Sequence, residues 1–436
     1  MKNCQGAAVP GNAELGAVLR ELRTARGMTL GTVANQVRCA PSLLSYVESG
    51  QRQLHEWLAA KLDEVYGTGG VVVSLLHGTV TMSDSPPFGV PSESDVFVVS
   101  LLGGEAMPLS RRELLASLSV GVAGTVLNRR FERAVEALDM TTDPLDHFAA
   151  TYDGFQVATR SLHPHRLIDG LTGSVAVLDG LRRRAGSKEQ SQYHQMQARF
   201  AESLSWLSEE AGDLPGAMYW IDRAAQWGQA ADWHAMSAYG FVRRSMMVVS
   251  FSGDGRRAID NATTVFSQSQ SSPRMRGLAA KQIAFGHALL GDQEASTRAL
   301  DQAVTLLSKP VQGGDALLGQ RSVLTEDLFT IFQTTCDIYL GRGEQAIASL
   351  APRLDSLSSS SARTATITRA KVARAYANIG QPEEAAHHAL AALDDIEAVG
   401  SQSARAELGR AARTFARWRG RDDMQAVLRR LQVRTA

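Results

Sequence analysis

Apolar and polar residues alternate in the first eighty positions with the spacing of short amphipathic helices. The repeat i, i+3, i+4, i+7 is occupied by Leu15, Val18, Leu19 and Leu22. It predicts a helix that ends at Gly27. A second short helix is predicted after Thr29, because threonine is a favoured N-cap residue. Its apolar positions are Leu30, Val33, Ala34 and Val37.

A third helix is predicted to begin at Pro41, since proline is favoured at the first position of a helix. Its apolar positions are Leu43, Leu44 and Val47. Gly50 is predicted to end this helix in the left-handed conformation. The second and third helices, separated by a three-residue break, form a predicted helix-turn-helix.

Two more helices are predicted, over residues 54–66 and 71–76. The first of these is expected to pack Trp57, Leu58 and Leu62. Together the five helices predict a small α-helical bundle at the N-terminus.

The order and spacing of these helices resemble the XRE (Cro/repressor-like) family of helix-turn-helix proteins, over residues 13–77. The resemblance implies that the helix 41–49 enters the major groove of DNA. It places the following residues toward bases or phosphates: Arg38, Pro41, Ser42, Ser45, Tyr46, Gln51 and Arg52. Pro41 departs from the family, which often has a long polar residue there, so base readout is expected from Ser42, Ser45 and Tyr46.

The charge of the chain weakens this interpretation without removing it. The whole chain has 45 basic and 45 acidic residues, which argues against a protein that coats nucleic acid. Residues 1–66 contain seven Lys and Arg and six Asp and Glu, a net charge of +1. This is a weak electrostatic footprint for DNA binding. A helical bundle that contacts other proteins is the alternative.

Residues 78–109 are rich in Ser and Pro and contain Gly103-Gly104, a composition typical of a linker. From residue 110 to residue 436 the pattern predicts helix after helix. Two helix pairs are expected over 111–139 and 143–184, before a recognisable repeat begins.

The repeat consists of a glycine, a polar turn and an alanine that opens a new helix. Its glycines are Gly212, Gly253, Gly291, Gly341, Gly380 and Gly420, with the alanines Ala217, Ala258, Ala295, Ala346, Ala385 and Ala426. The glycines are 41, 38, 50, 39 and 40 residues apart. Glycine ends one helix and a small alanine lets the next approach it. The pattern resembles tetratricopeptide repeats and implies an α-solenoid; irregular all-α packing is the alternative.

A solenoid of this type exposes a concave face formed by the first helix of each pair. The expected concave positions are Trp206, Arg243, Arg244, Met247, Lys281, Gln282, Phe285, Arg374 and Asn378. Basic residues in such positions grip carboxylates in tetratricopeptide domains, so the resemblance implies a peptide or another anionic ligand. A solvated helix face with ordinary charges is the alternative. A cluster of tryptophans between 206 and 233 is interpreted mainly as core between repeats.

No sequence motif proposes a reaction. P-loop, HExxH, GxSxG and dinucleotide-binding patterns are absent, and neither the histidines nor the three cysteines have metal-ligand spacing. We therefore expect no enzymatic activity, no cofactor and no metal. The longest apolar stretch, 114–127, is too short to cross a bilayer. A cytoplasmic protein without a membrane segment is expected.

The fold expected is all-α, with a five-helix N-terminal bundle, a linker and a tetratricopeptide-like solenoid. This organisation resembles XRE-family regulators of actinobacterial type. The resemblance implies a homodimeric transcription regulator that binds operator DNA and senses a peptide, a small molecule or a protein through its solenoid. The alternative is a scaffold or anti-regulator that acts through protein contacts and binds little or no DNA.

Overall fold

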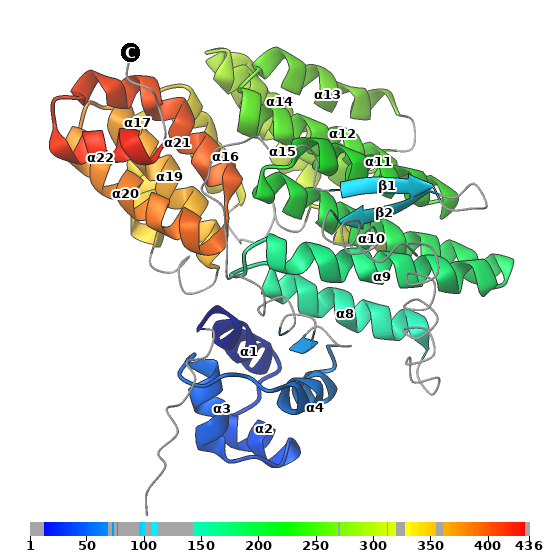
Figure 1. Cartoon of the computed structure of the whole chain (residues 1–436). Helices are drawn as coiled ribbons and strands as arrows, with labels where there is room; N and C mark the ends of the chain where they lie inside the picture. Colours follow the sequence, from blue (N-terminus) through cyan, green and yellow to red (C-terminus); the bar gives the residue numbers. More distant parts are fainter. Residues whose placement is uncertain are drawn as a thin grey trace, which may run out of the picture. The chain divides into compact units, whose positions relative to one another are not determined.

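A computed structural model describes residues 13–68, 72–73, 76, 96–100, 106–110, 143–268, 271–311, 313–319, 328–354 and 361–431. It divides into two compact units, Met1–Glu189 and Gln190–Ala436. The described part of the chain is all-α apart from one short hairpin, as the sequence predicts. Figure 1 shows the elements coloured along the sequence.

Four helices form the N-terminal bundle of the first unit, in the predicted order. They are α1 (Ala13–Ala25), α2 (Leu30–Gln36), α3 (Pro41–Glu48) and α4 (Glu56–Tyr66). Thr29 caps α2 by accepting a hydrogen bond from the backbone N–H of Thr32. The predicted apolar positions of α1 are buried, and so are Val33, Ala34, Leu44 and Val47. The helix-turn-helix fold therefore follows from the spacing of apolar residues.

The sequence predicts that Trp57 packs into the core of the bundle, and this prediction is wrong. Its side chain is 52% exposed, whereas Leu58 and Leu62 on the same helix are buried. Leu54, which precedes α4, and Tyr66, at the end of α4, are also buried. The Trp57 indole lies outside this core. Of the predicted fifth helix, the structure describes the helical residues Val72, Val73 and Leu76. Buried Asp63 of α4 accepts hydrogen bonds from the backbone N–H groups of Val72 and Val73.

Beyond the bundle, the described residues of the first unit form a hairpin and a helix pair. Strands β1 (Val96–Ser100) and β2 (Ala106–Ser110) pair antiparallel, with Val98 opposite Pro108. The hairpin lies almost wholly inside the segment predicted as a linker. Helices α8 (Pro144–Ala158) and α9 (His165–Arg184) pack together (Figure 1) and correspond to the pair expected over 143–184. The helices predicted within 111–139 lie outside the described residues.

The second unit is built from consecutive helix pairs. The first helices of the pairs, which we call the inner helices, are α10 (Ser187–Ala211), α12 (His234–Met247), α14 (Pro273–Leu289), α16 (Leu328–Tyr339), α19 (Ala362–Asn378) and α21 (Gln402–Phe415). Their partners are α11 (Leu214–Ala230), α13 (Gly255–Ser267), α15 (Gln293–Leu307), α17 (Gly343–Leu350), α20 (Pro382–Val399) and α22 (Asp422–Arg430). A π-helical turn, η1 (Val248–Ser252), extends α12. From α12 onward each inner helix packs against its partner, and the Ser205 hydroxyl of α10 donates to the Ala217 carbonyl of α11 at 2.8 Å.

The predicted glycine turns are confirmed in five of six places. Positive φ angles are found at Gly212, Gly253, Gly291, Gly341 and Gly380, each between an inner helix and its partner. Gly420 follows the short helix η5 (Ala416–Trp418) and has no positive φ, so that prediction is wrong. The 3-10 turn makes the chain reversal there instead.

Small residues after these glycines bring the partner helices together. Ala217, Ala258, Ala346 and Ala385 are completely buried, as predicted. Ala295 is only partly buried, because α15 turns Ser296 toward its inner helix instead. The Ser296 hydroxyl donates to the Ala284 carbonyl at 2.9 Å.

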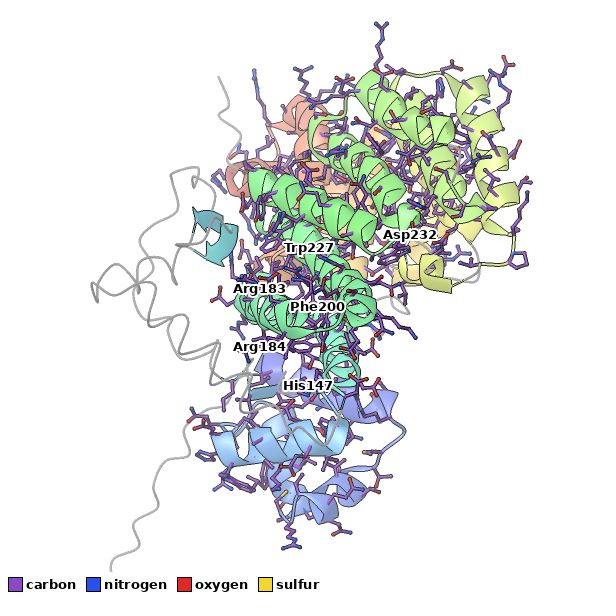
Figure 2. The ribbon with its side chains drawn as sticks, turned by 90° about the vertical axis from the view of Figure 1, so that its right-hand side faces the viewer. His147, Arg183, Arg184, Phe200, Trp227 and Asp232 are labelled. Carbon is purple, nitrogen blue, oxygen red and sulfur yellow. The ribbon has the colours of Figure 1, made fainter. Side chains whose placement is uncertain are left out.

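The tryptophan cluster lies mainly in the core of the second unit. Trp220 is completely buried, and Trp227 and Trp233 are 8% and 7% exposed. Figure 2 shows Trp227 and Phe200 among the helices that begin this unit. The interpretation of the cluster as core between helix pairs agrees with this burial.

The series of helix pairs bends back on itself. Helix α21 packs against α19 and also against η1, which lies four helix pairs earlier in the chain. At the same junction the hydroxyls of Ser401 and Ser403 donate to the Glu210 carboxylate of α10 at 2.7 and 2.6 Å. The inner helices therefore share one interior, in which residues far apart in sequence meet.

Candidate functional site

A left-handed residue shapes the turn before α3. Arg38 has φ of 56°, although it is not a glycine. The N–H of Cys39 donates to the Ala34 carbonyl at 2.9 Å and that of Arg38 to the Asn35 carbonyl at 3.3 Å. These two bonds form a Schellman motif that ends α2. The motif holds the Arg38 backbone in a conformation that costs a β-carbon-bearing residue about 1–2 kcal/mol.

Helix α3 presents one polar side to solvent. All seven residues expected to face DNA are exposed: Arg38, Pro41, Ser42, Ser45, Tyr46, Gln51 and Arg52. We call this set the recognition surface. Leu44 and Val47 anchor the opposite side of α3 in the core, and Leu43 is half-buried between the two sides. Tyr46 is 50% exposed, which is unusual for so large a ring and leaves it available for contact.

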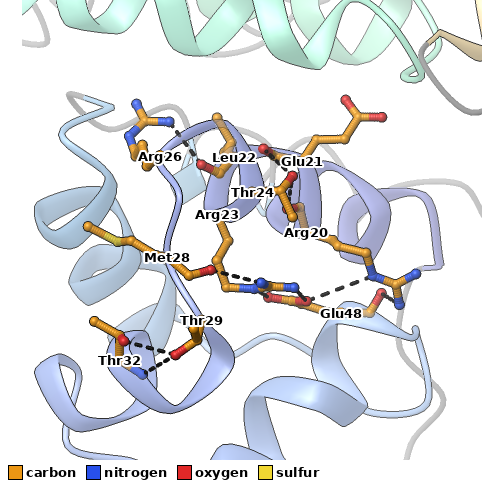
Figure 3. A network of polar contacts seen from close by, with 10 residues as sticks. All are labelled: Arg20, Glu21, Leu22, Arg23, Thr24, Arg26, Met28, Thr29, Thr32 and Glu48. Carbon is orange, nitrogen blue, oxygen red and sulfur yellow. Dashed lines mark hydrogen bonds and ion pairs between the residues drawn. The ribbon is translucent and has the colours of Figure 1, made fainter.

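An ion pair fixes the end of α3 to α1, as Figure 3 shows. Arg23 Nε and Nη2 donate to the two oxygens of the Glu48 carboxylate at 2.8 and 2.9 Å. Arg23 Nη1 also donates to the Met28 carbonyl at 3.0 Å. The bond to Glu48 raises the pKa of Arg23. A single guanidinium thus ties together α1, the loop before α2 and the end of α3.

Arg20 contributes less to this contact. Its Nε lies 3.8 Å from the carboxylate of Glu48, and its side chain is 57% exposed while that of Glu48 is 2% exposed. Sequence reasoning missed the Arg23–Glu48 pair because the two residues are 25 positions apart. The sequence contained one weak signal that Glu48 is buried, because Glu48 directly follows the apolar core position Val47.

The inner helices of the second unit bring together three of the predicted concave residues. Arg243 of α12 is 1% exposed and pairs with Glu209 of α10. Burial opposes charge on Arg243, but the Glu209 carboxylate raises the pKa of the guanidinium. Lys281 and Gln282 of α14 are 4% and 2% exposed. Lys281 lies close enough to Arg243 for the two charges to repel each other.

A second charged group lies on α19 and α21. Arg374 Nη1 donates to Glu407 at 2.9 Å, and Arg410 also pairs with Glu407. Burial alone raises the pKa of Glu407, but Arg410 and Arg374 bring it down to about 2. The Arg374 and Arg410 guanidiniums lie 5.1 and 5.3 Å from the Tyr339 ring centroid. Arg374 therefore already has an acidic partner within the chain.

The remaining predicted concave residues are spread over several surroundings. Arg244 pairs with Asp222 of α11, on the partner-helix side of α12. Trp206 lies beside Arg363, whose guanidinium is 5.4 Å from the indole centroid. Asn378 donates to the Ile338 carbonyl at 3.1 Å. Met247 is buried and Phe285 is half-buried.

Sequence reasoning missed several charged residues of this interior. They are Glu209, Lys371, Glu407 and Arg410, which we group with Arg243, Lys281 and Arg374 as the inner charge cluster. Lys371 Nζ donates to Thr335 Oγ1 at 3.0 Å. A signal for Glu407 and Arg410 was their position among the alanines of α21, where a buried side was expected to be apolar.

No three His, Cys, Asp or Glu side chains among the described residues are grouped to hold a metal ion. None of the described helices combines the length and the apolar character needed to cross a membrane.

Residues 14–76 match the model of a family described as a helix-turn-helix domain. The match spans the bundle that carries the recognition surface. No curated protein sequence matches the chain. A helix-turn-helix domain at these residues indicates a DNA-binding regulatory protein.

Proposed function

We propose that this chain is a sequence-specific transcription regulator that acts in the cytoplasm. In this proposal residues 1–77 bind operator DNA, and residues 110–436 form a tetratricopeptide-like domain that dimerises and senses a ligand. Residues 78–109 are the linker that connects these two domains. The observation that carries the proposal is the recognition surface: seven exposed residues on and beside α3, within a bundle that matches a helix-turn-helix family.

Helix α3 is the element that fits the major groove. Ser42, Ser45 and Tyr46 would contact base edges through hydroxyl groups, which both donate and accept hydrogen bonds. Arg38 and Arg52 lie at the two ends of α3 and would contact phosphates. The Arg23–Glu48 pair supports this docking because it fixes α3 before DNA is bound.

Dimerisation is part of the proposal because one bundle has a weak electrostatic footprint. With a net charge of +1 over residues 1–66, a single bundle gains little from counterion release. Two bundles held at a fixed spacing would bind two half-sites and combine their affinities. A ligand in the helical region would then act by favouring one arrangement of the two bundles.

The test is a DNA-binding titration of the full-length protein on promoter fragments, by gel shift over a series of salt concentrations. The double variant Arg38→Ala/Arg52→Ala removes two proposed phosphate contacts per bundle. This variant should bind DNA more weakly. The slope of log K against log salt concentration should become shallower by about 0.9 for each lost phosphate contact. Arg256→Ala/Arg257→Ala is the matched control, since both arginines are exposed on α13. It should leave affinity and slope unchanged.

Two results would contradict the proposal. An unchanged salt slope for Arg38→Ala/Arg52→Ala would show that α3 does not dock as described. Absence of binding to any genomic fragment at low salt would favour the scaffold or anti-regulator instead. Light scattering of the protein with and without DNA measures the proposed dimer directly.

A further inference from the structure

Most of the arginines that face the interior of the second unit have an acidic partner. Arg243 pairs with Glu209, and Arg374 and Arg410 share the Glu407 carboxylate. Because burying an unpaired charge is costly, such pairing is the normal state of interior ions. A buried cation that lacks a partner is therefore the exception that needs an explanation.

Lys281 is that exception. It is 4% exposed, and no described residue accepts a hydrogen bond from its ammonium group or forms an ion pair with it. Two aromatic rings lie near the ammonium group, with Nζ 5.9 Å from the Phe285 centroid and 5.1 Å from the Phe332 centroid. Aromatic faces attract a cation, but far less than a carboxylate does.

The charges that act on Lys281 are all of the same sign. They come from Lys371 of α19, Arg243 of α12 and Arg274 of α14 itself. Burial and these three cations lower the pKa of Lys281 to about 7. Lys281 thus faces three cations and no described carboxylate, whereas Arg243 beside it faces Glu209 and Glu202.

A second observation points in the same direction. The Nε–H of Arg243 is buried and has no hydrogen-bond acceptor among the described residues. A buried donor without an acceptor is unfavourable, and a ligand oxygen in this place would satisfy it. One anionic oxygen could accept hydrogen bonds from both the Arg243 Nε–H and the Lys281 ammonium group.

Aromatic side chains define the other part of the site. Phe285 packs edge-on against Phe332 and Tyr339, with ring centroids 6.3 and 6.1 Å apart. Phe285 and Tyr339 are half-buried, so their rings are not fully covered by the chain. A ligand that reaches Lys281 would contact these rings with its apolar part.

We propose that Lys281, together with Arg243 and Lys371, binds the carboxylate of a small organic acid whose apolar part packs on Phe285, Phe332 and Tyr339. This inference rests on the proposed ligand-sensing function and names its ligand class. Arg374 is left out of the site because it already has an acidic partner, Glu407. The near-complete burial of Lys281 favours a small acid over the surface of a protein partner.

The experiment compares three probes of similar shape on the full-length protein by calorimetry and thermal unfolding. The probes are phenylacetate, phenyl phosphate and the neutral phenylacetamide. Phenylacetate should bind at least about tenfold more tightly than phenylacetamide, because a charge-assisted hydrogen bond is worth more than a neutral one. At about ten times its Kd it should raise Tm by roughly 3 °C. Tighter binding of phenyl phosphate than of phenylacetate would identify phosphate esters as the source of the anion.

Lys281→Met should abolish the preference for anions while retaining the fold, since it replaces an unpaired ion by an apolar chain of similar length. Lys309→Met is the matched control, because Lys309 is exposed. Equal binding of phenylacetate and phenylacetamide, or an anion preference that persists in Lys281→Met, would overturn the site. The same proteins are then titrated with promoter DNA. Anion binding that depends on Lys281 without any effect on DNA binding would support the site and refute its sensing role.

Discussion

Replacement of Arg23 by methionine should strongly destabilise the N-terminal bundle, although Arg23 is not part of the recognition surface. The side chain of Glu48 is 2% exposed and receives two hydrogen bonds from Arg23. Methionine fills most of the same volume but leaves the carboxylate buried without its main partner. Breaking a buried ion pair on one side typically costs about 3–5 kcal/mol.

The structure places the expected cost at the lower end of that range. Arg20 lies 3.8 Å from the Glu48 carboxylate and can replace part of the lost interaction. A bundle of 63 residues, the length matched at 14–76, has a stability of about 3–9 kcal/mol. A loss of about 3 kcal/mol is therefore a large fraction of the total, and α3 should open about a hundredfold more often.

Hydrogen exchange of the intact protein, followed by mass spectrometry, measures this loss within α1 to α3 without requiring two-state unfolding of the whole chain. Arg20→Met is the matched control: it removes the same kind of residue from the same helix. Because Arg20 is 57% exposed, its pair with Glu48 should be worth at most about 1 kcal/mol. The double variant Arg23→Met/Glu48→Met should recover much of the protection. If Arg23→Met exchanges like Arg20→Met, the pair does not hold the bundle together.

Two further predictions concern packing and protonation. Gly16→Ala places a Cβ 2.6 Å from the carbonyl oxygens of Val47 and Glu48, so α1 and α3 must separate. The cost should be about 1–3 kcal/mol by the same exchange measurement. At Gly31 the nearest atom to a Cβ is Thr29 Oγ1 at 3.9 Å, an ordinary contact, so Gly31→Ala should be neutral or stabilising. The second prediction follows from the pKa of Lys281, which is about 7 in the folded chain and about 10.4 when unfolded. Between these values the unfolded chain binds more protons, so folding stability should rise with pH. Lys281 is faced by the cations of Lys371, Arg243 and Arg274 and by no described acid. Near pH 7, Lys281→Met should have a higher Tm than the unsubstituted protein, and this difference in Tm should shrink toward pH 10. A difference in Tm that does not change with pH would show that Lys281 stays protonated.

The candidate DNA interface could be predicted from sequence because it depends on short-range patterns. Apolar spacing fixes which side of α3 is buried, and the exposure of Ser42, Ser45 and Tyr46 follows from it. The same reasoning failed for Trp57, since hydrophobicity alone does not say whether a neighbouring element covers a side chain. Whether the exposed residues bind DNA remains a prediction for the salt titration.

The interior of the second unit shows the opposite case. Sequence patterns predicted the glycine turns and the close approach of Ala217, Ala258, Ala346 and Ala385. They also selected Arg243 and Lys281, but not what surrounds them. Arg243 has a carboxylate partner because Glu209 faces it from another helix. Lys281 has no such partner, and the residue that acts on it from α19 is another cation, Lys371.

The sequence by itself thus determined the helices, their ends and the side of each that is buried, because these depend on residues within a turn or two of each other. Only the tertiary structure decided which charges neutralise one another. Arg23 finds Glu48 25 residues away, and Arg410 reaches the Val249 carbonyl 161 residues away. Such partners are selected by how helices pack, since the energy of an ion depends on the charges and the water around it rather than on its neighbours in the chain.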